Sequence, residues 1–199
     1  MGKITAITVL SVVTFAATTF ALDVGVGASY APGYVAGGAS VNNGVDRGGF
    51  KGRISLGIYE DFNLAVGFGY NEFVYRRYLL WMEEQPAVES IPMVILTLGA
   101  DYAFPTGPFR PYVGGGAAIA RESAEARGHT AIDWYGGLYV EGGARYFVVN
   151  SLALEAGPRY TLLFDEPVVY YKDYNVRGFV RSEHRSQLIE LLFGINYYF

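Results

Sequence analysis

The chain has 199 residues, of which 51% are hydrophobic and 16% aromatic, and its formal net charge is -4. This length favours a single domain, and a mild charge with both signs scattered along the chain argues against a nucleic-acid-binding surface. Because cysteine is absent, disulfides, thiolate metal sites, cysteine nucleophiles and a lipid-modified cysteine are all excluded.

The first segment has the pattern of a secretory signal. Lys3 precedes an uncharged run over residues 4–22 that ends in small residues. Cleavage after Ala21 would put Thr19 and Ala21 at the two small-residue positions that the processing enzyme reads. The alternative is a transmembrane anchor, but the threonines lower the hydrophobicity of the run. We therefore predict a signal peptide over residues 1–21 and a mature domain over residues 22–199.

Eight segments of the mature chain share a two-residue alternation, which is typical of strands with different environments on their two faces. In the last of them, "LIELLFGINYYF", every second residue counted back from Phe199 is apolar, down to Ile189. The eight segments are residues 22–31, 50–59, 64–71, 92–102, 109–120, 134–147, 152–164 and 188–199. No later run is long and apolar enough for a helical span, so any membrane residence must come from strands.

The connections between these strands alternate between long and short. Long loops are predicted at 32–49, 72–90 and 165–184 and a medium one at "ESAEARGH", whereas the turns at Glu60–Asp61, "FPTGP" and "VVNS" are short. Outer-membrane barrels have short periplasmic turns and long extracellular loops. The pattern predicts an all-β fold, an eight-stranded antiparallel up-and-down transmembrane β-barrel, whose last strand pairs with the first so that every backbone group is satisfied in lipid.

Charges on the sixth and seventh strands fall only on the inner face. A turn centred on Asn150 places Arg145 opposite Glu155 and Glu141 opposite Arg159, within reach of an arginine fork. A slip of one residue would turn all four charges into lipid, at about 2–4 kcal/mol for each arginine near the midplane. The same face would extend the network to Lys51, Arg53, Asp101 and Glu190. We interpret this network as structural filling of the barrel, with a gate as the alternative.

Three phrases carry a family resemblance: "FRPYVGGGAAIA", "YVEGGARYFVVNSLALEAGPRYTLLF" and "LLFGINYYF". They resemble the eight-stranded outer-membrane barrels of the OmpA, OmpX, OmpW and opacity-protein type. This resemblance implies the outer membrane of a Gram-negative bacterium, no cofactor, and insertion by the assembly machinery. That machinery would read a C-terminal signal at Leu191, Phe193, Ile195, Tyr197 and Phe199. OmpA-type proteins carry a peptidoglycan-binding domain after the barrel, whereas we expect a barrel alone here.

Fold does not fix function, and three functions remain open. The leading hypothesis is a small non-enzymatic barrel with a largely filled interior and a role in envelope integrity or surface adhesion, because eight strands enclose little more than side chains. Glycines on the inner face keep a narrow solute channel as the alternative. The third is a lipid A-modifying enzyme, since His184, Ser186 and Glu190 resemble a deacylase motif. Its longer form is missing, however, and all three residues are predicted to face inward, away from a lipid substrate.

Two further patterns concern ligands at the predicted loops. His129 and His184 fall in different predicted loops, with no spacing that builds a metal site, so no metal is expected. Basic residues gather near the predicted extracellular ends, where arginine could bind lipopolysaccharide phosphates or be solvated like any loop charge. They are Arg76, Arg77, Lys172, Arg177, Arg181 and Arg185. Lipid, lipopolysaccharide and the assembly machinery are the expected partners, and what the loops bind is open.

Overall fold

The computed structural model describes residues 23–36, 43–46, 48–59, 61–76, 88–126, 129–164, 169–173, 176–180 and 186–199. Ten β segments in these ranges form one sheet, and β1 pairs with β12 to close it. The other two, β10 (Val169–Asp173) and β11 (Val176–Val180), form a separate hairpin. No helix among the described residues is long and apolar enough to span a membrane.

Two of the eight barrel strands are interrupted. The first consists of β1 (Val24–Ala31) and β2 (Gly33–Ala36), separated by Pro32, which has no N–H to donate to a neighbouring strand. The second consists of β3 (Asn43–Asp46) and β4 (Gly49–Tyr59), and Gly48 between them has a φ of 134°, which favours glycine. The remaining strands are continuous: β5 (Phe62–Arg76), β6 (Val88–Ala103), β7 (Phe109–Ala126), β8 (His129–Val149), β9 (Leu152–Leu163) and β12 (Ser186–Tyr198).

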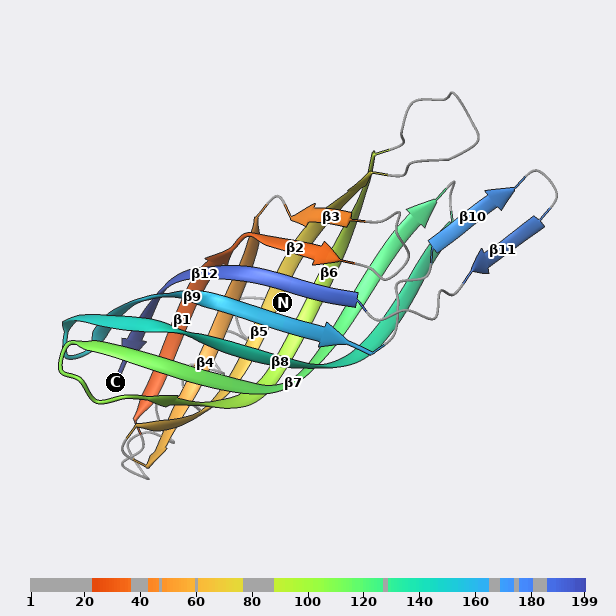
Figure 1. The fold of residues 1–199 in the computed structure, drawn as a ribbon. Coiled ribbons are helices and arrows are strands. Elements are labelled where there is room, and N and C mark those ends of the chain that lie inside the picture. The colour runs from red at the N-terminus through yellow and green to blue at the C-terminus, as the bar shows by residue number, and fades with distance from the viewer. Residues whose placement is uncertain are drawn as a thin grey trace, which may run out of the picture.

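All neighbouring strands are antiparallel, and the pairing runs without a gap around the circle (Figure 1). This is the predicted eight-stranded up-and-down barrel. The short connections at residues 60–61, 104–108 and 150–151 lie at one end, which we call the turn end. The other end, where β7 and β8 extend toward the β10–β11 hairpin in Figure 1, we call the loop end.

The segments predicted as loops contain more strand than expected. β2 and β3 lie within 32–49, β5 and β6 extend into 72–90, and β7 and β8 leave only residues 127–128 between them. The β10–β11 hairpin lies within 165–184. These segments were predicted as loops, and that prediction was wrong for the parts that are strand. Each further pair of residues adds ladder hydrogen bonds, and the tyrosines and valines of these segments favour strands despite the polar residues among them.

The two faces of the sheet differ as the alternation predicted. Large apolar side chains such as Leu98, Val140 and Phe193 are on the outside and more than half exposed. Aromatic residues gather outside the turn end, where Tyr102 packs against Phe104 and Tyr197 against Phe199, each at a ring distance of 5.1 Å. A closed barrel with an apolar exterior and aromatic rims is the arrangement that a bilayer requires.

Candidate functional site

Eight charged side chains on the inner face are joined in ion pairs, and we call these eight the lumen network. Their signs balance: four are cationic and four are anionic, so the network is neutral. Seven of the eight are buried, and the side chain of Arg53 is only 12% exposed. The members are Lys51, Arg53, Asp101, Glu141, Arg145, Glu155, Arg159 and Glu190. A neutral, hydrogen-bonded set is the form in which charges can be buried at low cost.

Two ion pairs lie between β8 and β9, in the register that a turn centred on Asn150 predicts. Glu141 is opposite Arg159, and Arg145 is opposite Glu155. Nε of Arg145 donates to Oε2 of Glu155 at 2.7 Å, and Nε of Arg159 donates to Oε2 of Glu141 at 2.9 Å. Both guanidinium groups also lie over tyrosine rings, at 4.3 Å from Tyr112 and 4.9 Å from Tyr139.

Arg53 connects opposite walls of the barrel. It comes from β4, which is separated from β8 by three strands in either direction. Its guanidinium donates to Oε1 of Glu141 at 3.1 Å and also pairs with Asp101 on β6. Since Asp101 accepts a second hydrogen bond from Arg145 at 2.7 Å, the ion pairs form a continuous chain across the lumen.

Lys51 and Glu190 form a second cluster, farther from the turn end. Nζ of Lys51 donates to Oε2 of Glu190 at 2.7 Å, and Asn71 donates to Oε1 of the same carboxylate at 3.0 Å. Glu190 is completely buried. The carboxylate of the proposed His184, Ser186 and Glu190 motif is thus held inside the lumen by two other residues. His184 lies outside the described residues.

Neutral polar side chains complete the network, and these were not predicted as members. The Tyr112 hydroxyl donates to Glu155 at 3.2 Å, and the Asn196 amide donates to the same carboxylate at 3.0 Å. Asn63 donates to Asp101 at 3.1 Å. The two-residue alternation already placed these side chains on the inner face. Which carboxylate each of them contacts depends on how the barrel closes.

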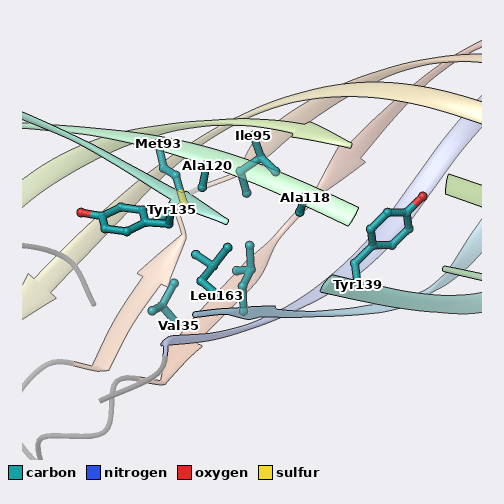
Figure 2. Close-up of a cluster of buried hydrophobic side chains, with 9 residues drawn as sticks. Val35, Met93, Ile95, Ala118, Ala120, Tyr135, Tyr139 and Leu163 are labelled. Atoms are coloured by element: carbon teal, nitrogen blue, oxygen red, sulfur yellow. The ribbon is translucent and has the colours of Figure 1, made fainter. Parts of the chain in front are cut away.

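An apolar layer fills the lumen nearer the loop end. Met93 and Ile95 on β6 point toward Val35 and Leu163 on other walls, as Figure 2 shows. Two tyrosines flank the cluster, and one of them, Tyr135, donates its hydroxyl to Glu122 at 3.1 Å. The full layer is Val35, Met93, Ile95, Ala118, Ala120, Tyr135, Tyr139, Leu163 and Leu188.

Some inner glycines make room for large side chains. A Cβ atom on Gly99 would collide with the hydroxyl of Tyr139 and with the carbonyl of Gly115. A Cβ atom on Gly25 would lie only 2.9 Å from Cε1 of Tyr198. The glycines therefore support a filled interior more than an open one.

Two cavities lie in the barrel interior and at its turn end. One, of about 20 Å³, lies within the lumen network beside Arg53, Glu141 and Asn196, which is room for about one water molecule. The other, of about 390 Å³, opens at the turn end. We call it the turn-end vestibule, and it extends from Asp61 and Arg110 at the rim to Arg145 of the network.

The structure also locates the predicted assembly signal, some of the predicted basic residues and one of the histidines. The residues of the proposed assembly signal, Leu191, Phe193, Ile195, Tyr197 and Phe199, all face outward. Lys172 and Arg177 are opposite one another in the β10–β11 hairpin, and Arg76 ends β5. Arg77, Arg181 and Arg185 lie outside the described residues. His129 begins β8 and is therefore in a strand, contrary to the predicted loop. No group of His, Asp and Glu among the described residues could hold a metal ion.

A family model, the outer membrane protein beta-barrel domain, matches residues 4–180. The chain belongs to this family. Together with the closed barrel and its apolar exterior, this match identifies a small bacterial outer-membrane β-barrel protein. None of the curated protein sequences matches the chain.

Solved structures show the same fold. The chain is similar to Neisserial surface protein A, with a TM-score of 0.60 and 23% identity over 88% of this chain and 97% of that one. It is also similar to OprG of Pseudomonas aeruginosa, with a TM-score of 0.57 and 12% identity over 89% and 95% of the two chains. Ail of Yersinia pestis, the attachment invasion locus protein crystallised with the heparin analogue sucrose octasulfate, has a TM-score of 0.53 and 12% identity over 89% and 99%.

Proposed function

We propose that the protein is a non-enzymatic outer-membrane barrel whose lumen is closed to solutes, and that it acts in envelope integrity or surface adhesion through its loop end. The observation that carries this proposal is the neutral lumen network, which connects opposite walls through Arg53. The apolar layer adds a second obstruction, because ions do not cross a dry apolar constriction.

The loop end supports a surface role. Strands β7 and β8 extend to residues 126 and 129, and the β10–β11 hairpin adds structure at the same end. Ail, which shares the fold, was crystallised with a heparin analogue. A sulfated or acidic surface ligand for this protein is consistent with the basic residues predicted near these ends, Lys172 and Arg177 among them.

A narrow channel for small molecules is the second candidate. It is favoured by the turn-end vestibule of about 390 Å³, which extends inward to Arg145. A pore would require the cavity of about 20 Å³ in the network to widen and the apolar layer to part.

Liposome swelling with small sugars separates these two candidates. Liposomes that contain the purified, refolded protein should swell no faster than protein-free liposomes. A general porin serves as the positive control. Swelling at a rate comparable to the porin would overturn the closed-lumen proposal. Adhesion and envelope roles are tested by a deletion strain, which should lose binding to surfaces or resistance to detergent and recover both when the gene is restored.

We also propose that residues 1–21 are a signal peptide that directs the chain through the inner membrane. The supporting observations are the pattern of Lys3, the uncharged run and the small residues before Leu22. Residues 1–22 lie outside the described ranges. N-terminal sequencing of protein from an outer-membrane fraction should give a chain that begins at Leu22, and an intact N-terminus would contradict the proposal.

A further inference from the structure

The outward face of the barrel carries one cation at an unusual place. Counting along β7, the outward-facing residues from Phe109 to Ile119 are uncharged, and the next one is Arg121. Among the barrel residues whose side chains the structure describes, the other charged residue that faces outward is Glu72, which has an interaction of its own. An arginine on the lipid-facing surface needs a partner of opposite charge, because burial of an unpaired charge in lipid is costly.

The height of Arg121 places it at the outer boundary of the bilayer. It is twelve residues beyond Phe109 along β7 (109 to 121). At a rise of about 3.3 Å per residue and a tilt of about 40°, it lies roughly 30 Å above the turn-end rim. The apolar band of such barrels is about 25 Å tall. Arg121 therefore reaches the level of the lipid headgroups at the loop end, which faces outward in this class of barrel.

The surroundings of Arg121 are those of an interfacial anchor. Its direct neighbours across the two ladders are Val94 on β6 and Trp134 on β8. The guanidinium carbon lies 6.0 Å from the Trp134 ring centroid, and Trp134 is 60% exposed. Tryptophan prefers the membrane interface, where one part of the ring meets lipid and its N–H meets water.

No carboxylate of a described residue forms an ion pair with Arg121. Every described arginine of the lumen, in contrast, pairs with Asp or Glu. A planar guanidinium matches a phosphate group, to which it can donate two parallel hydrogen bonds. The outer leaflet of an outer membrane presents phosphates at this level, on the lipid A part of lipopolysaccharide.

We propose that Arg121 and Trp134 form a binding site for a lipid A phosphate on the outer wall of the barrel. The guanidinium binds the phosphate, and the indole ring packs against the first part of an acyl chain. This site differs from the basic residues predicted at the loops, because it lies on the barrel wall and its two residues come from adjacent strands. The proposed lipid A site requires that the barrel lies in the outer membrane. It does not require that the lumen is closed to solutes.

The test measures lipid that stays bound to the purified protein. Wild-type protein and the Arg121→Gln variant are refolded in phosphatidylcholine nanodiscs that contain a small fraction of lipid A, and bound lipid is counted by native mass spectrometry after extraction. The wild type should retain lipid A about tenfold better than the variant, as expected for loss of a charge-assisted hydrogen bond. Arg121→Lys should retain an intermediate amount, because it keeps the charge but not the fork.

A matched control is available on the same strand. Arg110→Gln removes an equal charge from β7 at the turn end, where Arg110 pairs with Asp61 at 3.5 Å, and it should retain lipid A like the wild type. The heat-dependent shift of the folded barrel on an electrophoresis gel shows whether each variant is folded.

Two further lipids, tested in the same way, identify the chemical group that Arg121 binds. Lipid A without its phosphates should bind wild type and Arg121→Gln equally and weakly. Phosphatidylglycerol should bind the wild type less well than lipid A does. Equal retention of lipid A by wild type and Arg121→Gln would overturn the site, and equal retention of phosphatidylglycerol would overturn its assignment to lipid A.

Discussion

The two halves of the lumen are filled by opposite chemistry. Toward the turn end, the lumen network holds eight charges in ion pairs and hydrogen bonds. Toward the loop end, the apolar layer packs aliphatic and aromatic side chains from several strands against one another. The network depends on specific partners, so the loss of one charged side chain leaves its partner as an unpaired buried charge. The apolar layer depends on shape and tolerates substitutions that preserve volume.

The largest effect is expected when a buried partner is removed from the network. Lys51→Leu leaves Glu190 without its cation in a completely buried position. We expect the free energy of unfolding, measured by denaturant titration in lipid vesicles, to fall by about 3–5 kcal/mol. The double variant Lys51→Leu with Glu190→Leu should recover much of this loss, since it leaves no charge behind. A double variant as unstable as the single one would show that packing, not charge, dominates there.

A smaller loss is expected in the apolar layer. Leu188 is 1% exposed, and Leu191 on the same strand is 50% exposed to the outside. Leu188→Ala should lower the free energy of unfolding by about 2–4 kcal/mol, because it creates a cavity in the lumen. Leu191→Ala is the matched control and should cost clearly less, since lipid fills the space. Equal costs at the two positions would contradict the assignment of the faces.

The neutral partners of the network sharpen the comparison further. Tyr112→Phe removes the hydroxyl that donates to Glu155 at 3.2 Å. The expected loss in unfolding free energy is about 1–2 kcal/mol, because a hydrogen bond to a charged group is lost while two other donors to Glu155 remain. Tyr146→Phe, on the outside of β8, should change the same free energy by less than about 0.5 kcal/mol. A larger loss in the control variant would point to a general effect of tyrosine removal.

The smallest effect is expected in conductance. Arg159→Ala breaks the ion pair with Glu141, but the apolar layer stays in place above it. Planar-bilayer conductance should therefore remain at the wild-type level, because the apolar constriction still excludes ions. An increase on this substitution would make the network itself the gate.

The register of β8 and β9 is a case in which the sequence was sufficient. The two members of each charge pair around Asn150 are close in sequence, separated by ten residues in one pair and eighteen in the other. One tight turn therefore determines which side chains meet. A one-residue slip would expose four charges to lipid, and a two-residue slip would leave each charge pair only on a diagonal. The same argument accounts for the outward face of β12, where the apolar alternation is unbroken.

The apolar layer is a case in which the sequence was not sufficient. Both faces of β12 carry apolar residues in this part of the strand, at Leu188, Ile189, Leu191 and Leu192. The sequence therefore does not indicate what the inward-facing side chains contact. Leu188 and Leu192 proved to be buried inside the barrel. The loop-end strands were underestimated for a related reason, because polar residues there mask the strand preference of the tyrosines and valines between them.

By itself the sequence determined the central part of the eight strands, their alternation, the closed antiparallel barrel and the local register at Asn150, because a lipid environment forces a period of two and leaves no unpaired backbone. Only the tertiary structure decided which charges meet across the lumen. Arg53 is 48 residues from Asp101 and 88 from Glu141 along the chain, so no local pattern links them. Closure brings β4 opposite β8, and the strand order and tilt of the barrel then set the heights at which their inward side chains meet.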